Sequence, residues 1–136
     1  GLNNQTDFCF LSNKENQLFK RIEAYFEIEK PFLDQDFSLT NAEKYLGISG
    51  RYISEAIKQE TNLNFSAYVN QSRINYLTKY LSKEINFEGK TIDEIATELG
   101  FRSVNSFYQF VRKTKGCTPK EFLNTGVKSE IYDLVT

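Results

Sequence analysis

Residues 91–101 read TIDEIATELGF and carry the clearest structural signal in the chain. Thr91 and Glu94 have the form of a capping box, in which a hydroxyl and a carboxylate satisfy the free backbone N–H groups at the start of a helix. Gly100 follows Leu99 and can supply the positive φ that ends a helix. The stretch therefore predicts a short helix that stops in a tight turn.

The same pattern occurs earlier in the chain. Residues 38–48, SLTNAEKYLGI, match 91–101 at an offset of 53. After one inserted residue the offset becomes 54, and the cap, apolar face, basic end and stop of a second helix recur. The matched pairs are Ser49 with Ser103, Ile53 with Phe107, Ile57 with Val111, Lys58 with Arg112 and Asn62 with Gly116. A repeated short helix, glycine turn and second helix is the helix-turn-helix signature.

The remaining segments complete an all-α prediction. A capping box at Ser12 and apolar residues at helical spacing predict an amphipathic helix over about 13–29, which Pro31 ends. Asn64 precedes a longer apolar stripe over about 65–83. We therefore expect two tandem helix-turn-helix units joined by a long linking helix, with an extra N-terminal helix. The expected boundaries are 1–37 for the extension, 38–63 and 85–125 for the two units, 64–84 for the linking helix and 126–136 for the tail.

Composition restricts the function further. The 136 residues include no histidine, which removes Ser-His and Cys-His catalysis, and only two cysteines, Cys9 and Cys117, which we expect to be reduced. We therefore predict no enzymatic activity, no metal and no cofactor. No apolar run is long enough to cross a membrane, so a cytoplasmic protein is expected. With no Met at position 1, the chain is expected to be a fragment of a longer protein, whose missing part would hold a sensor and could anchor the whole in a membrane.

The net charge of −1 does not by itself indicate a nucleic-acid ligand, but its distribution does. Residues 1–37 carry a net charge of −3, residues 38–125 carry +3, and residues 126–136 carry −1. The basic part coincides with the repeat. Because the second helix of a helix-turn-helix enters the major groove, two repeats predict two insertions in consecutive grooves.

Residues 38–123 resemble the DNA-binding domain of the AraC/XylS family of bacterial transcription regulators. Residues 91–101 and the closing GCTPKEF at 116–122 carry the strongest resemblance, and LGIS at 46–49 with RYIS at 51–54 adds the first unit. The resemblance implies sequence-specific binding to double-stranded DNA, commonly activation through RNA polymerase, and a separate region for sensing or homodimerisation. The preceding helix and its loop at residues 30–34 also resemble the extension found in members fused to larger, sometimes membrane-bound, sensory proteins.

Carried over by position, the resemblance implies two sets of DNA contacts. The base contacts are Arg51, Ser54, Glu55, Val104, Asn105, Tyr108 and Gln109, and the backbone contacts are Lys58, Arg102, Ser103, Ser106, Arg112 and Lys113. An ordinary solvated helix face is the competing interpretation, and the repeat outweighs it for Arg51, Asn105 and Gln109. Glu55 is either a specificity determinant or a source of phosphate repulsion, and the sequence favours neither.

Other positions are expected to be structural. Arg73 and Lys79 are predicted to be solvated or in salt bridges, and the aromatic residues of the linking helix and second unit to lie in the core: Tyr68, Tyr76, Tyr80, Phe107, Phe110 and Phe122, with Val111. Glu43 stands where the second unit has Ala96, so a distorted or shifted first helix is expected. The main alternative function is a protein-interaction module that retains the fold without binding DNA. A DNA-repair enzyme fused to such a domain is a second alternative.

Overall fold

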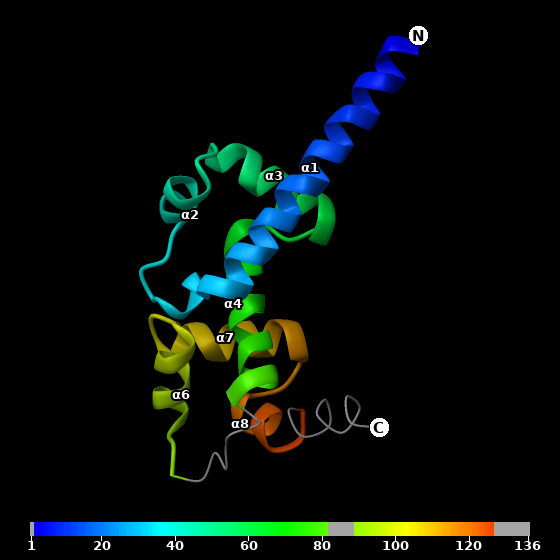
Figure 1. Cartoon of the computed structure of the whole chain (residues 1–136). Coiled ribbons are helices and arrows are strands. Elements are labelled where there is room, and N and C mark those ends of the chain that lie inside the picture. The colour runs from blue at the N-terminus through cyan, green and yellow to red at the C-terminus, as the bar shows by residue number, and fades with distance from the viewer. Residues whose placement is uncertain (1, 82–88, 127–136) are drawn as a thin grey trace. The chain divides into compact units, whose positions relative to one another are not determined.

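The computed structural model describes the backbone of residues 2–81 and 89–126 and the side chains of residues 16–79 and 89–124. Every regular element in these ranges is helical (Figure 1), which confirms the all-α prediction. The chain divides into two compact bodies. The N-terminal lobe comprises Gly1–Pro31 and Phe37–Val69, and the C-terminal lobe comprises Phe32–Asp36 and Asn70–Thr136. We call residues 32–36 the connector.

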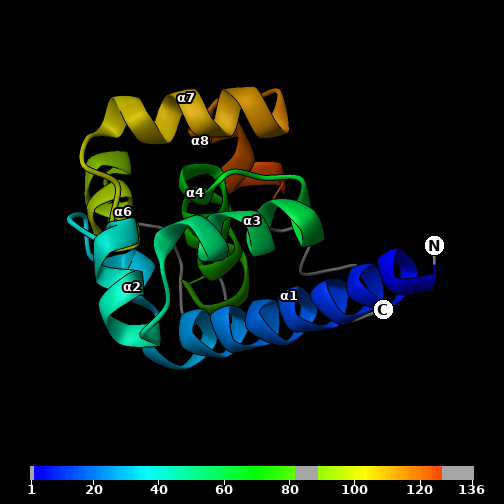
Figure 2. The same cartoon turned by 90° about the horizontal axis from the view of Figure 1, so that it is seen from above.

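The N-terminal lobe is built on three helices and the start of a fourth. They are α1 (Leu2–Glu29), α2 (Leu39–Leu46), α3 (Gly50–Thr61) and α4 (Phe65–Tyr76). Helix α1 lies alongside α3 (Figure 2). Ile22 of α1 and Ile53 and Ile57 of α3 are fully buried, as the spacing of three and four within α3 predicted. The N-terminal helix is therefore part of the packing that supports the first helix-turn-helix.

Helix α1 is longer than the sequence predicted. It begins at Leu2 instead of near residue 13, so the capping box at Ser12 does not start it. Residues 2–29 contain neither glycine nor proline, and nothing in their backbone chemistry forces an interruption. The end lies where predicted: α1 stops at Glu29, Lys30 takes φ 49°, and Pro31 follows.

Aromatic rings fill much of the N-terminal lobe. Tyr25 stacks on Tyr45 with ring centroids 4.0 Å apart, and Phe26 packs against Phe37 and Tyr68 at 5.7 and 4.9 Å. Burial, with a smaller contribution from the negative charge of nearby Glu23, raises the pKa of Tyr68 to about 12. Tyr68 is thus a packing residue, as expected.

The C-terminal lobe contains the second repeat. After α4 the helix continues in π geometry over Leu77–Leu81, so the linking helix extends as predicted to the limit of the described residues, while 82–88 lie outside them. Helices α6 (Ile92–Leu99), α7 (Val104–Lys115) and α8 (Pro119–Glu121) follow, and a final π-helical turn spans Phe122–Gly126. The core of this lobe consists of Ile74, Leu77, Ile95, Ala96, Leu99, Phe101, Phe107, Val111, Phe122 and Leu123.

Arg73 belongs to this lobe and is only 8% exposed, so the prediction of a solvated or ion-paired residue is wrong. Its guanidinium donates to the carbonyl oxygens of Phe32 and Asp34 at 2.7 and 3.3 Å and lies 5.2 Å from the Phe101 ring centroid. Burial lowers the pKa of Arg73, and the charge of Asp34 partly opposes this. No local pattern indicates these partners, because the two carbonyl groups lie about 40 residues away from Arg73 in the chain.

Candidate nucleic-acid interface

The two helix-turn-helix pairs have the same helix lengths. Helices α2 and α6 each have 8 residues, and helices α3 and α7 each have 12. Both turns begin with a glycine in the left-handed region, Gly47 at φ 68° and Gly100 at φ 94°. The internal repeat found in the sequence is therefore a repeat of backbone structure.

Both longer helices begin and end on matching caps. The Ser49 hydroxyl accepts from the Arg51 N–H at 3.4 Å, and the Ser103 hydroxyl accepts from the Ser106 N–H at 3.1 Å. At the other ends, Asn62 and Gly116 adopt φ 63° and 71°. These caps define where α3 and α7 begin and end, and the outer faces of both helices carry the predicted contact residues.

Glu43 does not distort the first helix, so that expectation is wrong. Helix α2 runs regularly from Leu39 to Leu46, and the Glu43 carboxylate turns toward the next helix. Its Oε1 accepts a hydrogen bond from the Gly50 N–H at 2.6 Å. The residue that takes the place of a small alanine thus gains a specific partner across the turn.

The outer face of α3 carries an internal ion pair. The Arg51 side chain is 81% exposed, and its Nε lies 3.3 Å from Oε1 of Glu55 one turn later. Lys58 is exposed further along the helix, and Ser54 is half-buried. The structure therefore brings the four predicted residues of this helix onto accessible surface, with the charges of Arg51 and Glu55 already paired.

Tyr52 is an accessible residue of α3 that sequence reasoning did not single out. Tyr52 is 59% exposed, which is a high value for a large aromatic residue that could be packed in the core. Tyr52 aligns with Ser106 of α7 at the offset of 54, and that correspondence is the sequence signal that could have identified it.

The outer face of α7 is polar and then basic. Asn105 and Gln109 are exposed, and Val104 and Tyr108 are half-buried beside them. The Ser106 hydroxyl lies 3.0 Å from that of Ser103. The face ends in three exposed cations, Arg112, Lys113 and Lys115.

Arg102 precedes α7 and contacts the connector. Its guanidinium donates to the Gln35 carbonyl oxygen and to Oδ1 of Asp36, both at 3.3 Å. The side chains of Arg102 and Asp36 are 74% and 77% exposed, so this ion pair is weak and open to exchange with solvent or another anion.

Net charge differs between the two helices. Residues 50–61 of α3 contain two basic and two acidic side chains, whereas residues 104–115 of α7 contain three basic side chains and no acidic one. A phosphate backbone is attracted mainly by clustered Lys and Arg. The geometry thus offers two accessible helices of similar form, of which α7 has the stronger attraction for a polyanion.

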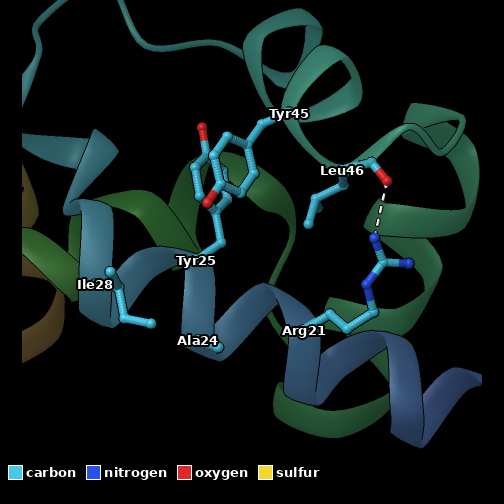
Figure 3. Close-up of a pocket in the computed structure, with 6 residues that line it drawn as sticks. All are labelled: Arg21, Ala24, Tyr25, Ile28, Tyr45 and Leu46. Atoms are coloured by element: carbon cyan, nitrogen blue, oxygen red, sulfur yellow. Dashed lines mark hydrogen bonds between the residues drawn. The ribbon is translucent and has the colours of Figure 1, made fainter.

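Other kinds of site have less support in the described part of the chain. A shallow groove of about 200 Å³ lies between α1 and α2 (Figure 3), lined by Arg21, Ala24, Tyr25, Ile28, Tyr45 and Leu46. Within residues 16–79 and 89–124, no cluster of Cys, Asp and Glu side chains could hold a metal ion. No described helix is both long enough and apolar enough to cross a membrane.

Residues 43–125 match a family described as a helix-turn-helix domain, and this family is of the AraC type. The chain belongs to the AraC-type helix-turn-helix family. The match begins within α2 and continues through α3, α4, the second repeat and α8, so it includes every residue predicted to touch DNA. This family membership makes the chain a DNA-binding domain of a transcription regulator.

Curated relatives have names that agree with this family. A regulator named YfiF of Bacillus subtilis is 33% identical over 93 residues, covering 68% of this chain and 28% of the relative. A regulator named SAS0078 of Staphylococcus aureus is 26% identical over 110 residues, covering 81% of this chain. Both are described as uncharacterised HTH-type transcriptional regulators. The chain spans only 13% of the length of the staphylococcal relative.

Two solved structures have a similar fold. The C-terminal domain of the two-component response regulator yesN from Fusobacterium nucleatum has a TM-score of 0.59 at 27% identity, covering 79% of this chain and 95% of that domain. The C-terminal domain of AraT, a response regulator from Geobacillus stearothermophilus, also has a TM-score of 0.59, at 28% identity, covering 76% and 82%. The C-terminal domains of these two response regulators thus share this helical arrangement.

Proposed function

We propose that this domain binds duplex DNA sequence-specifically by inserting α3 and α7 into consecutive major grooves, about 34 Å or one helical turn apart. In this proposal residues 38–63 and 85–125 read DNA, and residues 64–84 join them. The observation that carries it is the repeat of backbone, caps and exposed polar positions between the two helix-turn-helix pairs. One chain then does what other helix-turn-helix proteins do as dimers.

Base reading is assigned to the exposed residues near the starts of α3 and α7. Arg51 suits the O6 and N7 acceptors of guanine, and Asn105 and Gln109 suit the donor and acceptor pair of adenine. Val104 fits a thymine methyl group, and Glu55 can accept from the N4 group of cytosine. Ser54 and Tyr108 are half-buried beside these residues and complete the two sets.

Contacts to the DNA backbone fix the register of the two helices. We assign them to Lys58 in the first pair and to Arg102, Ser103, Ser106, Arg112 and Lys113 in the second. Arg102 would exchange its exposed partner Asp36 for a phosphate group, to which a guanidinium can donate two charge-assisted hydrogen bonds. Tyr52, at the position equivalent to Ser106, would add a hydroxyl contact in the first pair.

The partners of the whole protein are a separate proposal, because this chain spans only a small part of the length of its curated relatives. We propose that the full-length protein regulates transcription through RNA polymerase, commonly as an activator, and dimerises through a region outside this chain. Neither proposal is needed for DNA reading by the two helices.

The test is a selection of binding sites from a random duplex library at low salt, followed by a salt titration on the winning sequence. Two short enriched blocks about one helical turn apart are expected. Arg51→Ala should remove the preference in one block, and Asn105→Ala the preference in the other, each by about 1–3 kcal/mol of discrimination. Lys113→Ala should reduce the salt slope by about 1 at every sequence, whereas Lys20→Ala on α1 should not.

Two outcomes would contradict the proposal. A single enriched block that responds only to Asn105→Ala would show that α3 does not read bases. A folded domain that enriches nothing, and whose binding to other proteins is insensitive to salt, would favour the protein-interaction module instead.

A further inference from the structure

The start of the first recognition helix is held from α2 by one carboxylate. Oε1 of Glu43 accepts from the N–H of Gly50, the first residue of α3, at 2.6 Å. This N–H is among the groups at a helix start that have no partner within the helix. A carboxylate there is favoured twice, by a charge-assisted hydrogen bond and by the positive end of the helix dipole.

Gly50 supplies the space that this contact needs. A Cβ added at Gly50 would lie 2.8 Å from Cγ and Cδ2 of Leu39 and would also clash with Oε1 of Glu43. Gly50 is absent from the glycines of this chain with positive φ, so its backbone conformation does not require glycine. Its lack of a side chain is therefore a matter of close approach between α2 and α3.

The second helix-turn-helix has the opposite order of side-chain sizes at the aligned positions. The residues that align with Leu39, Glu43 and Gly50 are Ile92, Ala96 and Val104. There the small residue lies on the first helix and the branched one on the second. In the first pair the long residue lies on the first helix and the residue without a side chain on the second. The two solutions are complementary in volume, and mixing them would leave either a clash or a gap.

We propose that Glu43 is a positioning residue for DNA reading by α3, and that Gly50 is its required complement. Arg51 directly follows Gly50, so the hydrogen bond that fixes Gly50 also fixes the direction in which the guanidinium leaves the helix. The carboxylate acts through the helix and does not contact DNA. This inference rests on the proposed function, because it assigns a role within the reading of the first DNA block.

The test compares binding to the selected two-block duplex with binding to a duplex whose first block is scrambled. Glu43→Ala should weaken binding to the two-block duplex about tenfold and leave binding to the scrambled duplex within about twofold. Glu43→Gln keeps an oxygen acceptor and should stay within about threefold of the wild type. Glu60→Ala, which removes an exposed acid of the first pair, measures the purely electrostatic gain from losing a negative charge.

A second set of variants transfers side chains of the second helix-turn-helix to the aligned positions of the first. Gly50→Val alone should lose first-block preference, because the added side chain meets Leu39 and Glu43. The triple variant Leu39→Ile, Glu43→Ala, Gly50→Val installs the solution of the second pair and should recover preference for the first block at least tenfold over Gly50→Val. The amide proton of residue 50, followed by NMR, should lie downfield in the wild type and Glu43→Gln and move upfield in Glu43→Ala.

The possible results distinguish a failure of the Glu43 proposal from a failure of two-block reading by α3. If the wild type reads two blocks and folded Glu43→Ala still discriminates the first block fully, Glu43 is not a positioning residue. The proposal is also overturned if the triple variant folds with native circular dichroism and performs no better than Gly50→Val. If the wild type itself has no first-block preference while Asn105→Ala abolishes the second, it is two-block reading by α3 that has failed.

Discussion

The turns of the two helix-turn-helix pairs have the same backbone and different surroundings. A Cβ added at Gly47 in the first pair would meet nothing within 4 Å, whereas one added at Gly100 would lie 2.8 Å from the Leu33 carbonyl group of the connector. The second turn is one residue longer, and its Phe101 is buried in the core. The motif is thus locally encoded, but each copy is stabilised by its own neighbours.

Each lobe also has an arginine that donates to backbone carbonyl oxygens, and the two arginines differ in burial. In the C-terminal lobe, buried Arg73 holds the connector against Phe101. In the N-terminal lobe, exposed Arg21 of α1 donates to the Leu46 carbonyl oxygen at 2.9 Å at the end of α2. A buried guanidinium must keep its partners to offset the cost of desolvation, whereas an exposed one can exchange them for water. The second turn is therefore more sensitive to the loss of its support.

The largest expected effect tests the two cores at equivalent positions. Ile53 and Phe107 are both fully buried. Phe107→Ala should lower the free energy of unfolding by about 4 kcal/mol and Ile53→Ala by about 3 kcal/mol, because each removes apolar contacts and leaves a cavity. Urea denaturation followed by circular dichroism measures both. A cost below about 1 kcal/mol at either position would mean that its core collapses around the smaller residue.

The second-largest expected effect on the free energy of unfolding comes from replacing the two arginines. Arg73→Met retains much of the side-chain volume but leaves the carbonyl oxygens of Phe32 and Asp34 without their donor, so the free energy of unfolding should fall by about 3 kcal/mol. Arg21→Met should cost less than about 1 kcal/mol, because water can replace an exposed donor. Equal costs, measured by the same urea denaturation, would refute the contrast between a buried and an exposed support.

Glycine substitutions separate conformation from contact. Gly47→Ala should cost about 1 kcal/mol, the strain of a left-handed conformation in open space. Gly100→Ala should cost about 2–3 kcal/mol, because overlap with the Phe32 and Leu33 backbone adds to that strain. Thermal unfolding of the two variants gives the difference directly. A larger loss at Gly47 would show that surroundings do not distinguish the two turns.

The smallest effect concerns charge on α3. Glu55→Gln removes one acid from the outer face and releases Arg51 from its pair. For a phosphate about 7 Å away in water, the lost repulsion is about 0.6 kcal/mol, so affinity for non-specific duplex should rise about threefold. Fluorescence anisotropy at low salt measures it. A simultaneous loss of preference within the first selected block would identify Glu55 as a reader of cytosine, and unchanged preference would identify it as a source of repulsion.

Local patterns predicted the elements well where a signal lies within one or two turns of helix. The capping residue Thr91, the stop at Gly100 and the buried face of α3 follow from spacing and cap chemistry, and the structure confirms them. The start of α1 was missed because the Ser12 motif is compatible with the interior of a helix as well as with its beginning. The predicted contact residues on α3 and α7 are exposed or half-buried, and their contacts with DNA stay predictions.

The repeat and the helical class followed from the sequence by itself, because caps, glycine stops and apolar periodicity act between residues close in the chain, and the family followed from the resemblance of its motifs to AraC/XylS regulators. Only the tertiary structure showed that Arg73 is buried, that Asp36 pairs with Arg102 and that Glu43 caps α3 through Gly50. Each of these depends on which segments pack together. Side-chain polarity predicts that a charged group needs a partner, but the partner is chosen by the packing of segments distant in sequence.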